Sequence, residues 1–98
     1  MNRMNEKDTE RLFEAILTLE TVEECKSFFE DICTVKEIQD IAQRLKAAGM
    51  LKNGENYTVV SRETGMSTAT ISRVNKCLGY GDGGYKLVLD RLEKKGEK

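Results

Sequence analysis

The sequence contains no proline, no histidine and no tryptophan, and these absences narrow what the chain can be. Without proline, no helix is interrupted from within. Without histidine, the commonest general base is missing, and a zinc site would need carboxylates beside the cysteine thiols. The three cysteines, Cys25, Cys33 and Cys77, form no C-x-x-C pair, so we expect reduced thiols and neither a metal nor another cofactor. No nucleophile–base pair can be assembled, which predicts that the protein is not an enzyme.

The sequence also lacks long apolar runs. None approaches the roughly 18 residues that a membrane helix requires. The N-terminal segment MNRMNEKDTER has no apolar stretch of the kind found in signal peptides. We therefore expect a cytoplasmic protein without membrane contact. The glycine cluster 79-GYGDGG-84 lacks both a preceding strand and the GK[ST] ending of a phosphate-binding loop, so we interpret it as a linker.

Helical periodicity is what the sequence does contain. With 98 residues, of which 34% are charged and 39% hydrophobic, it is typical of one soluble domain, predicted over residues 1–98. Apolar residues recur at helical spacing from segment 5–20 to segment 85–95, and no segment alternates like a strand. The sequence predicts an all-α fold of about six short helices.

Local signals predict where several of these helices begin and end. The capping boxes Thr21-x-x-Glu24 and Thr34-x-x-Glu37 open the second and third helices. Gly49 and the following KNGEN segment are expected to end the third. In the last helix, the side chains predicted to face inward are Leu87, Val88, Leu89 and Leu92.

The first two helices carry wide apolar faces that include Phe13, Leu17, Phe28 and Phe29. A chain of this length has little else with which to cover them. Two interpretations remain open. The faces form an ordinary core within the chain, or they pack across the two-fold axis of a homodimer.

Segment 57-YTVVSRETGMSTATISRVNKCL-78 predicts a helix-turn-helix. Thr58 is expected to begin a short helix, and Gly65 supplies the sharp turn because glycine adopts a positive φ at little cost. Ser67 can cap the second helix by accepting from the N–H of residue 69 or 70. Ile71 and Val74, three residues apart, should face back onto the first helix.

The opposite face of the second helix carries small and hydroxylated side chains, namely Thr68, Ala69 and Ser72. Such a face can enter a DNA major groove without a clash, and its methyls and hydroxyls can contact base edges. We therefore predict that these three residues read bases. The cations expected to hold DNA phosphates are Arg62, Arg73 and Lys76. The alternative is a generic helical corner, since such corners are common.

The charge is unevenly distributed along the chain. Residues 1–54 carry eight positive and eleven negative side chains, whereas residues 55–98 carry eight and six. The net charges are therefore −3 and +2, although the whole chain has a formal net charge of −1. DNA requires only a local basic surface, so this distribution is compatible with DNA binding.

The chain resembles the Trp repressor superfamily, and over its whole length it is similar to the YerC/YecD branch. The resemblance rests on Thr34, on Arg44 ten residues later, and on the run GMSTATISR, which is similar to Gly-x-x-x-Ala-Thr-Ile-Thr-Arg in the family. It implies an intertwined, all-helical homodimer that binds double-stranded DNA at an operator and represses transcription.

The same resemblance implies an effector pocket for tryptophan, formed by residues that match Thr34, Arg44, Arg73, Val74 and Cys77. Val74 stands where the family has glycine, and Cys77 where it has a ligand-holding serine. A branched side chain removes the space that an indole ring would use. We therefore expect no tryptophan corepressor, and no other small-molecule effector is identified. For Arg44, a surface pair with Asp40 is the alternative interpretation.

Taken from the sequence, the expected function is that of a homodimeric, sequence-specific transcription regulator acting as a repressor. The alternative from another class is a protein-interaction module that has kept the helix-turn-helix without binding DNA.

Overall fold

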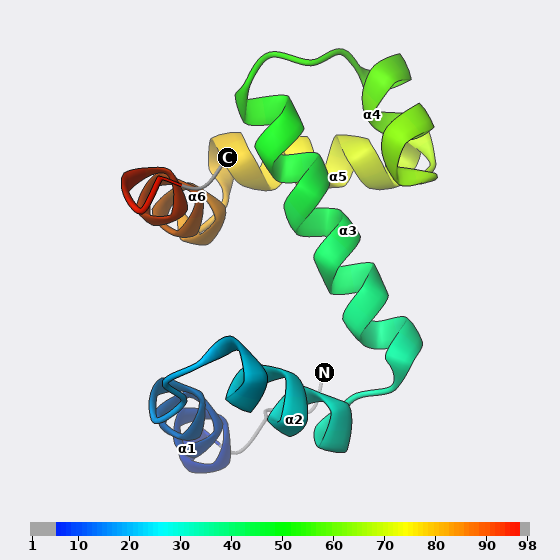
Figure 1. The fold of residues 1–98 in the computed structure, drawn as a ribbon. Coiled ribbons are helices and arrows are strands. Elements are labelled where there is room, and N and C mark those ends of the chain that lie inside the picture. Colours follow the sequence, from blue (N-terminus) through cyan, green and yellow to red (C-terminus); the bar gives the residue numbers. More distant parts are fainter. Residues whose placement is uncertain (1–5, 97–98) are drawn as a thin grey trace. The chain divides into compact units, whose positions relative to one another are not determined.

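The computed structural model describes residues 6–96, so the two ends of the predicted 1–98 domain lie outside the described range. It contains α1 (Glu6–Leu17), α2 (Val22–Ile32), α3 (Val35–Lys52), α4 (Tyr57–Thr64), α5 (Thr68–Tyr80) and α6 (Gly84–Lys94) (Figure 1). Over these residues the predicted all-α fold of six helices is confirmed, and no strand is present. Every helix in this range is too short or too polar to span a bilayer.

The chain divides into two compact units, with the boundary between Ile38 and Gln39. The first unit contains α1, α2 and the first residues of α3. The second contains the rest of α3 together with α4, α5 and α6.

Hydroxyl caps begin α2 and α3, as the two capping boxes predicted. At α3, Thr34 Oγ1 accepts from the N–H of Glu37 at 3.0 Å, and Glu37 Oε1 accepts from the N–H of Thr34 at 2.8 Å. At α2, Thr21 Oγ1 accepts from the N–H of Glu24 at 3.0 Å. Here the returning bond reaches one residue further, because Glu24 Oε1 accepts from the N–H of Glu20 at 2.8 Å. Both helix starts therefore use side chains to pair N–H groups that the helix itself leaves open.

Within the first unit, much of the apolar surface of α1 and α2 is exposed, although Ile16, Phe28 and Phe29 are partly buried. Neither helix has a buried residue. Phe13 is 58% exposed and Leu17 is 83% exposed. The rings of Phe28 and Phe29 meet edge to face, with centroids 5.7 Å apart and an interplanar angle of 89°. The two interpretations left open by the sequence, a core within the chain and packing across a two-fold axis, both stay predictions.

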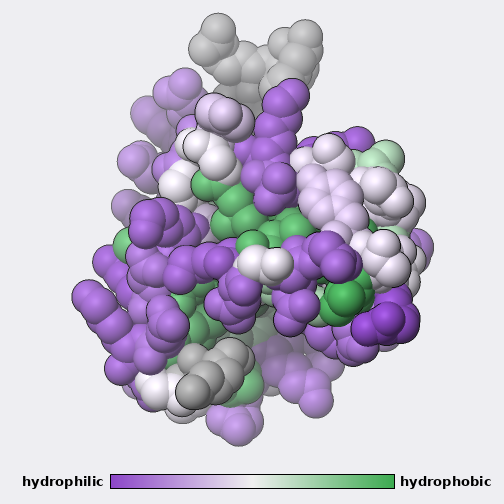
Figure 2. All heavy atoms as spheres, turned by 90° about the horizontal axis from the view of Figure 1, so that it is seen from above, coloured by the Kyte–Doolittle hydropathy of each residue, from purple (hydrophilic) through white to green (hydrophobic). Residues whose placement is uncertain are grey.

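The second unit has a small aliphatic core in which α3, α4 and α5 meet. The buried side chains, all between 0% and 3% exposed, are Ala47, Ala48, Val60, Ile71 and Val74. Helix α3 contributes the two alanines, α4 contributes Val60, and α5 contributes Ile71 and Val74. Partly buried residues, including Tyr85 and Leu89 of α6, pack against this core. In the view of Figure 2, hydrophilic residues predominate and hydrophobic ones show only between them.

Predictions for α3 and α6 are only partly confirmed. The KNGEN segment ends the third helix as predicted, since α3 ends at Lys52. Gly49 does not stop it, because one glycine inside a helix costs only about 1 kcal/mol. In α6, Leu87 is 49% exposed and Val88 is 44% exposed, so neither faces inward as predicted. Leu89, whose Cδ2 atom lies against Gly49, and Leu92 are partly buried. The core of the second unit is too narrow to cover all four apolar side chains of α6.

The start of α4 also differs from the prediction. The helix begins at Tyr57 rather than Thr58, because Asn56 is its N-cap, with Asn56 Oδ1 accepting from the N–H of Val59 at 2.9 Å. We expect Asn56→Ala to lower the free energy of unfolding by about 1 kcal/mol, since an open N–H loses its partner. Thr58→Ala is the control, and it should change stability by less than half as much. Chemical denaturation measures both, and the reverse order would restore Thr58 as the helix start.

Candidate nucleic-acid interface

The corner between α4 and α5 is held by glycine geometry and by hydroxyl groups. Gly65 adopts φ 74° and ψ 6°, the left-handed conformation that glycine allows, and its N–H donates to the carbonyl of Ser61 at 2.8 Å. Ser61 Oγ donates to the carbonyl of Met66 at 2.9 Å. Thr64 Oγ1 donates to the carbonyl of Val60 at 2.7 Å and accepts from the N–H of Met66 at 3.2 Å. The predicted turn at Gly65 is confirmed, and the side chains beside it fix its shape.

Ser67 caps α5, as the sequence predicted. Its Oγ accepts from the N–H of Thr70 at 3.2 Å, and the two hydroxyl oxygens lie 3.0 Å apart. Lys46 of α3 makes a further connection at the other end of the corner, where its Nζ donates to the carbonyl of Glu63 at 3.4 Å. A cation is favourable near the C-terminal carbonyls of a helix, so Lys46 helps to hold α4 against α3.

The two faces of α5 are segregated as the spacing predicted. Ile71 is fully buried and Val74 is 3% exposed, whereas Thr68, Ala69 and Ser72 are all exposed. The hydroxyls of Thr68 and Ser72 make no hydrogen bond to any residue in the range 6–96. Small side chains with free donors and acceptors therefore line the outer face of a helix whose inner face is locked into the core.

The three predicted phosphate-binding cations are all exposed. The Arg62 side chain is 66% exposed and its Nε lies 3.8 Å from Glu63 Oε2. A pair that long and that exposed is weak and is screened by salt, so it leaves Arg62 able to bind another anion. Arg73 and Lys76 lie on α5 without an ion pair to the described residues.

The residues of the predicted effector pocket have very different environments. Thr34 lies in the first unit, where it caps α3. In the second unit, Arg44 is exposed on α3, and Arg73 and Cys77 are exposed one turn apart on α5. Val74, between them in sequence, points the other way and belongs to the buried core. The inward orientation expected for Val74 is confirmed, so its isopropyl group fills space beneath α5.

Sequence reasoning missed a groove between α5 and α6. Its lining includes Ser72, Asn75, Lys76 and Gly79, together with Tyr80, which is 89% exposed, and Lys86. Lys52 of α3 also lines the groove. Asp90 accepts from Lys52 Nζ at 3.1 Å and from Lys86 Nζ at 3.3 Å. These hydrogen bonds, first that from Lys52 and then that from Lys86, hold the pKa of the Asp90 carboxyl below its usual value. The sequence contains one signal of this groove, which is Tyr80 between two glycines in the 79-GYGDGG-84 segment that we interpreted as a linker.

The fold and the site define a class, that of small helical proteins with a helix-turn-helix whose second helix presents a free polar face. Residues 7–93 match the Trp repressor protein family, and the chain belongs to that family. It is 48% identical to the uncharacterised protein YerC of Bacillus subtilis (strain 168) over 93 residues, which are 95% of this chain and 89% of YerC. The crystal structure of a TrpR-like protein from Eubacterium eligens is also similar. Its TM-score is 0.86 with 47% sequence identity, over 89% of this chain and 90% of that one.

Proposed function

We propose that the protein is a homodimeric, sequence-specific DNA-binding regulator that acts without catalysis as a transcriptional repressor in the cytoplasm. One observation carries the proposal. The hydroxyls of Thr68 and Ser72 are exposed and free, while neighbouring hydroxyls are used to hold the corner. Family membership supports the same function. In this proposal Thr68, Ala69 and Ser72 contact base edges in the major groove.

The cations give this interface its affinity. Three cations are exposed in the helix-turn-helix, Arg62 on α4 and Arg73 and Lys76 on α5. Contacts to phosphate oxygens position a protein on DNA without reading its sequence, whereas base contacts provide specificity. The proposal therefore assigns affinity to cations of α4 and α5, and specificity to other side chains of α5.

The homodimer is supported by the uncovered apolar side chains. The exposed ones include Phe13, Leu17 and Val22 in the first unit and Leu87 and Val88 in α6. Large apolar surfaces of this kind mark protein–protein contacts. A second copy of the chain offers the same faces, and a two-fold axis would then present two copies of α5 to the DNA.

The proposal includes no tryptophan corepressor. The Val74 side chain is 3% exposed and belongs to the core that holds α5 against α3 and α4. It supplies, from within the protein, packing that an aromatic ligand would otherwise add beneath α5. The base-reading helix is then held in place without a ligand.

Two single substitutions test the division of labour on α5. We expect Lys76→Ala to weaken binding to all DNA sequences alike and to lower the slope of log affinity against log salt concentration by about 0.9 per half-site. Thr68→Ala should instead relax the preference at one base pair per half-site, by about 1–3 kcal/mol. Gel-shift titrations with genomic fragments at several salt concentrations measure both. If neither variant differs from the unmodified protein, α5 is not the base-reading helix.

A further inference from the structure

The groove between α5 and α6 continues the outer face of the base-reading helix. Ser72, Lys76 and Tyr80 follow one another at four-residue spacing, so they lie along one face of α5, and all three line the groove. Lys86 of α6 forms part of the opposite wall. The groove thus begins at a residue proposed to read bases and ends at exposed polar groups beyond it.

The width of the DNA major groove suggests which part of a duplex would contact Lys76, Tyr80 and Lys86. Tyr80 lies eight positions beyond Ser72 on α5, which at 1.5 Å per residue is a distance of about 12 Å. The major groove of B-DNA is also about 12 Å wide. If the N-terminal half of α5 reads bases in the DNA major groove, its C-terminal half crosses one of the two strands that border that DNA groove. Residues from Lys76 to Tyr80 then lie at the phosphates of that strand.

The side chains of the groove are suited to a phosphate. Lys76 has no ion pair with the residues that the structure describes. Lys86 pairs with Asp90 at 3.3 Å, but its side chain is 68% exposed, and such a pair can exchange partners at little cost. Asp90 would still keep its 3.1 Å contact with Lys52. Tyr80, with a ring that contacts little else, can donate its hydroxyl to a phosphate oxygen.

We propose that the groove between α5 and α6 binds a backbone phosphate of the DNA strand that flanks the base-reading contacts. Lys76 and Lys86 supply the charge, and Tyr80 supplies a neutral donor. The inference rests on the proposed function, because it requires α5 to lie in the major groove. It adds α6 and the 79-GYGDGG-84 segment to the DNA-contacting surface.

Gly79 offers a test that leaves the packing intact. It is a helical residue that lines the groove, and a Cβ atom placed on it would meet nothing within 4 Å. Gly79→Gln and Gly79→Glu add side chains of equal size, of which only the second carries a charge. We expect the glutamine variant to bind operator fragments like the unmodified protein. The glutamate variant should bind on the order of tenfold more weakly at about 0.1 M salt, with the difference shrinking as salt rises.

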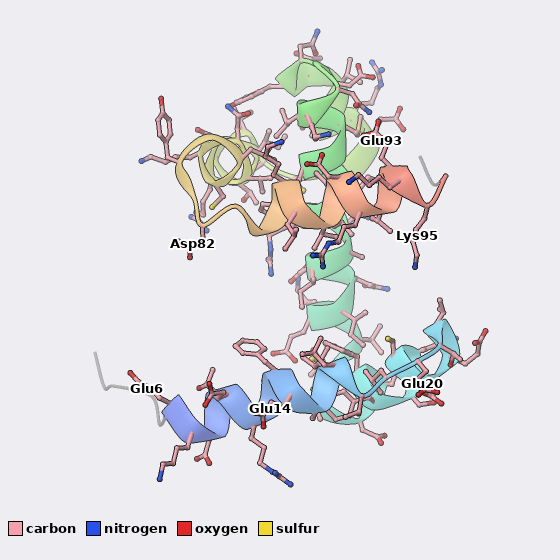
Figure 3. The ribbon with its side chains drawn as sticks, turned by 90° about the vertical axis from the view of Figure 1, so that its left-hand side faces the viewer. Glu6, Glu14, Glu20, Asp82, Glu93 and Lys95 are labelled. Carbon is pink, nitrogen blue, oxygen red and sulfur yellow. The ribbon has the colours of Figure 1, made fainter. Side chains whose placement is uncertain are left out.

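A second pair of variants tests the lysine of α6. Lys86→Gln should make the slope of log affinity against log salt concentration shallower by about 0.9 per half-site. Lys95→Gln is the control. It removes the same charge at the C-terminal end of α6, whereas Asp82 lies before the N-terminal end (Figure 3), and it should leave the slope unchanged. Equal slopes for the two variants, together with equal affinities for the two Gly79 variants, would overturn the inference while the proposed function stands.

A phosphate can also come from a free ligand, so mononucleotide and inorganic phosphate are titrated separately by calorimetry. We expect neither to saturate at millimolar concentration, because a single phosphate lacks the other contacts that hold a duplex. Saturable mononucleotide binding that Gly79→Glu abolishes, with operator binding unchanged, would overturn the assignment to DNA. If the unmodified protein bound no DNA fragment at all, the proposed function and this inference would both fall.

Discussion

Phe13→Glu is expected to convert the proposed homodimer into a monomer at micromolar concentration. Phe13 is 58% exposed on α1, a helix without a buried residue. Burying such a ring against a partner contributes about 1.5–3 kcal/mol, and a two-fold axis counts the change twice. The dimer dissociation constant should therefore rise by about two to four orders of magnitude. Light scattering over a dilution series measures the mass directly.

Arg11→Gln is the matched control, because it changes the net charge by the same amount on the same helix. It should leave the mass and the melting temperature unaltered, whereas Phe13→Glu should also lower the melting temperature and make it depend on concentration. A dimer further implies a pseudo-palindromic operator, with half-sites about 34 Å apart. A monomeric mass for the unmodified protein, or a footprint over a single half-site, would contradict the proposed assembly.

The second large effect is expected from Val74→Gly. The substitution removes a side chain that is 3% exposed and puts glycine in the middle of α5. The lost packing and the glycine together should cost about 2–4 kcal/mol, a large part of the stability of a small domain. Thermal and chemical unfolding measure it. Asn75→Gly is the control, since it places glycine at the adjacent exposed position and reports the backbone contribution alone.

Tryptophan provides the second half of the Val74 experiment. A ligand that binds only the folded state adds about 2.7 kcal/mol when present at 100 times its dissociation constant. We expect no such shift in the unmodified protein, and no change in its operator affinity. Binding by Val74→Gly alone would identify Val74 as the obstacle to an indole ring beside Arg44 and Arg73. Saturable micromolar binding by the unmodified protein would instead restore tryptophan as a corepressor.

Local signals predicted much of this fold because their causes lie within a few residues. Thr34 and Ser67 cap helices through bonds to residues three positions away, and Gly65 turns the chain by its own φ. The three-residue spacing of Ile71 and Val74 likewise predicted the buried face of α5. These features do not depend on any distant part of the chain.

Features that depend on distant residues escaped prediction. Leu87 and Val88 have the periodicity of core residues, yet both are largely exposed and neither belongs to the core of the second unit. The groove beside Tyr80 requires Lys76 of one helix and Lys86 of another to come together, and nothing in either segment signals the other. The N-cap Asn56 was missed for a different reason, because Thr58 is also an acceptable cap and only the backbone conformation distinguishes the two.

The hydroxyl groups of the corner form two sets, and substitutions in the two sets have different consequences during evolution. Those of Ser61, Thr64 and Ser67 are bonded within the turn, while those of Thr68 and Ser72 have no protein partner in the described range. Substitution in the first set would alter the scaffold, whereas substitution in the second would leave it intact. Under the proposed function, single substitutions at Thr68 and Ser72 would therefore change base preference without loss of folding. The same property makes positions 68 and 72 suitable for randomisation in a library that selects altered recognition.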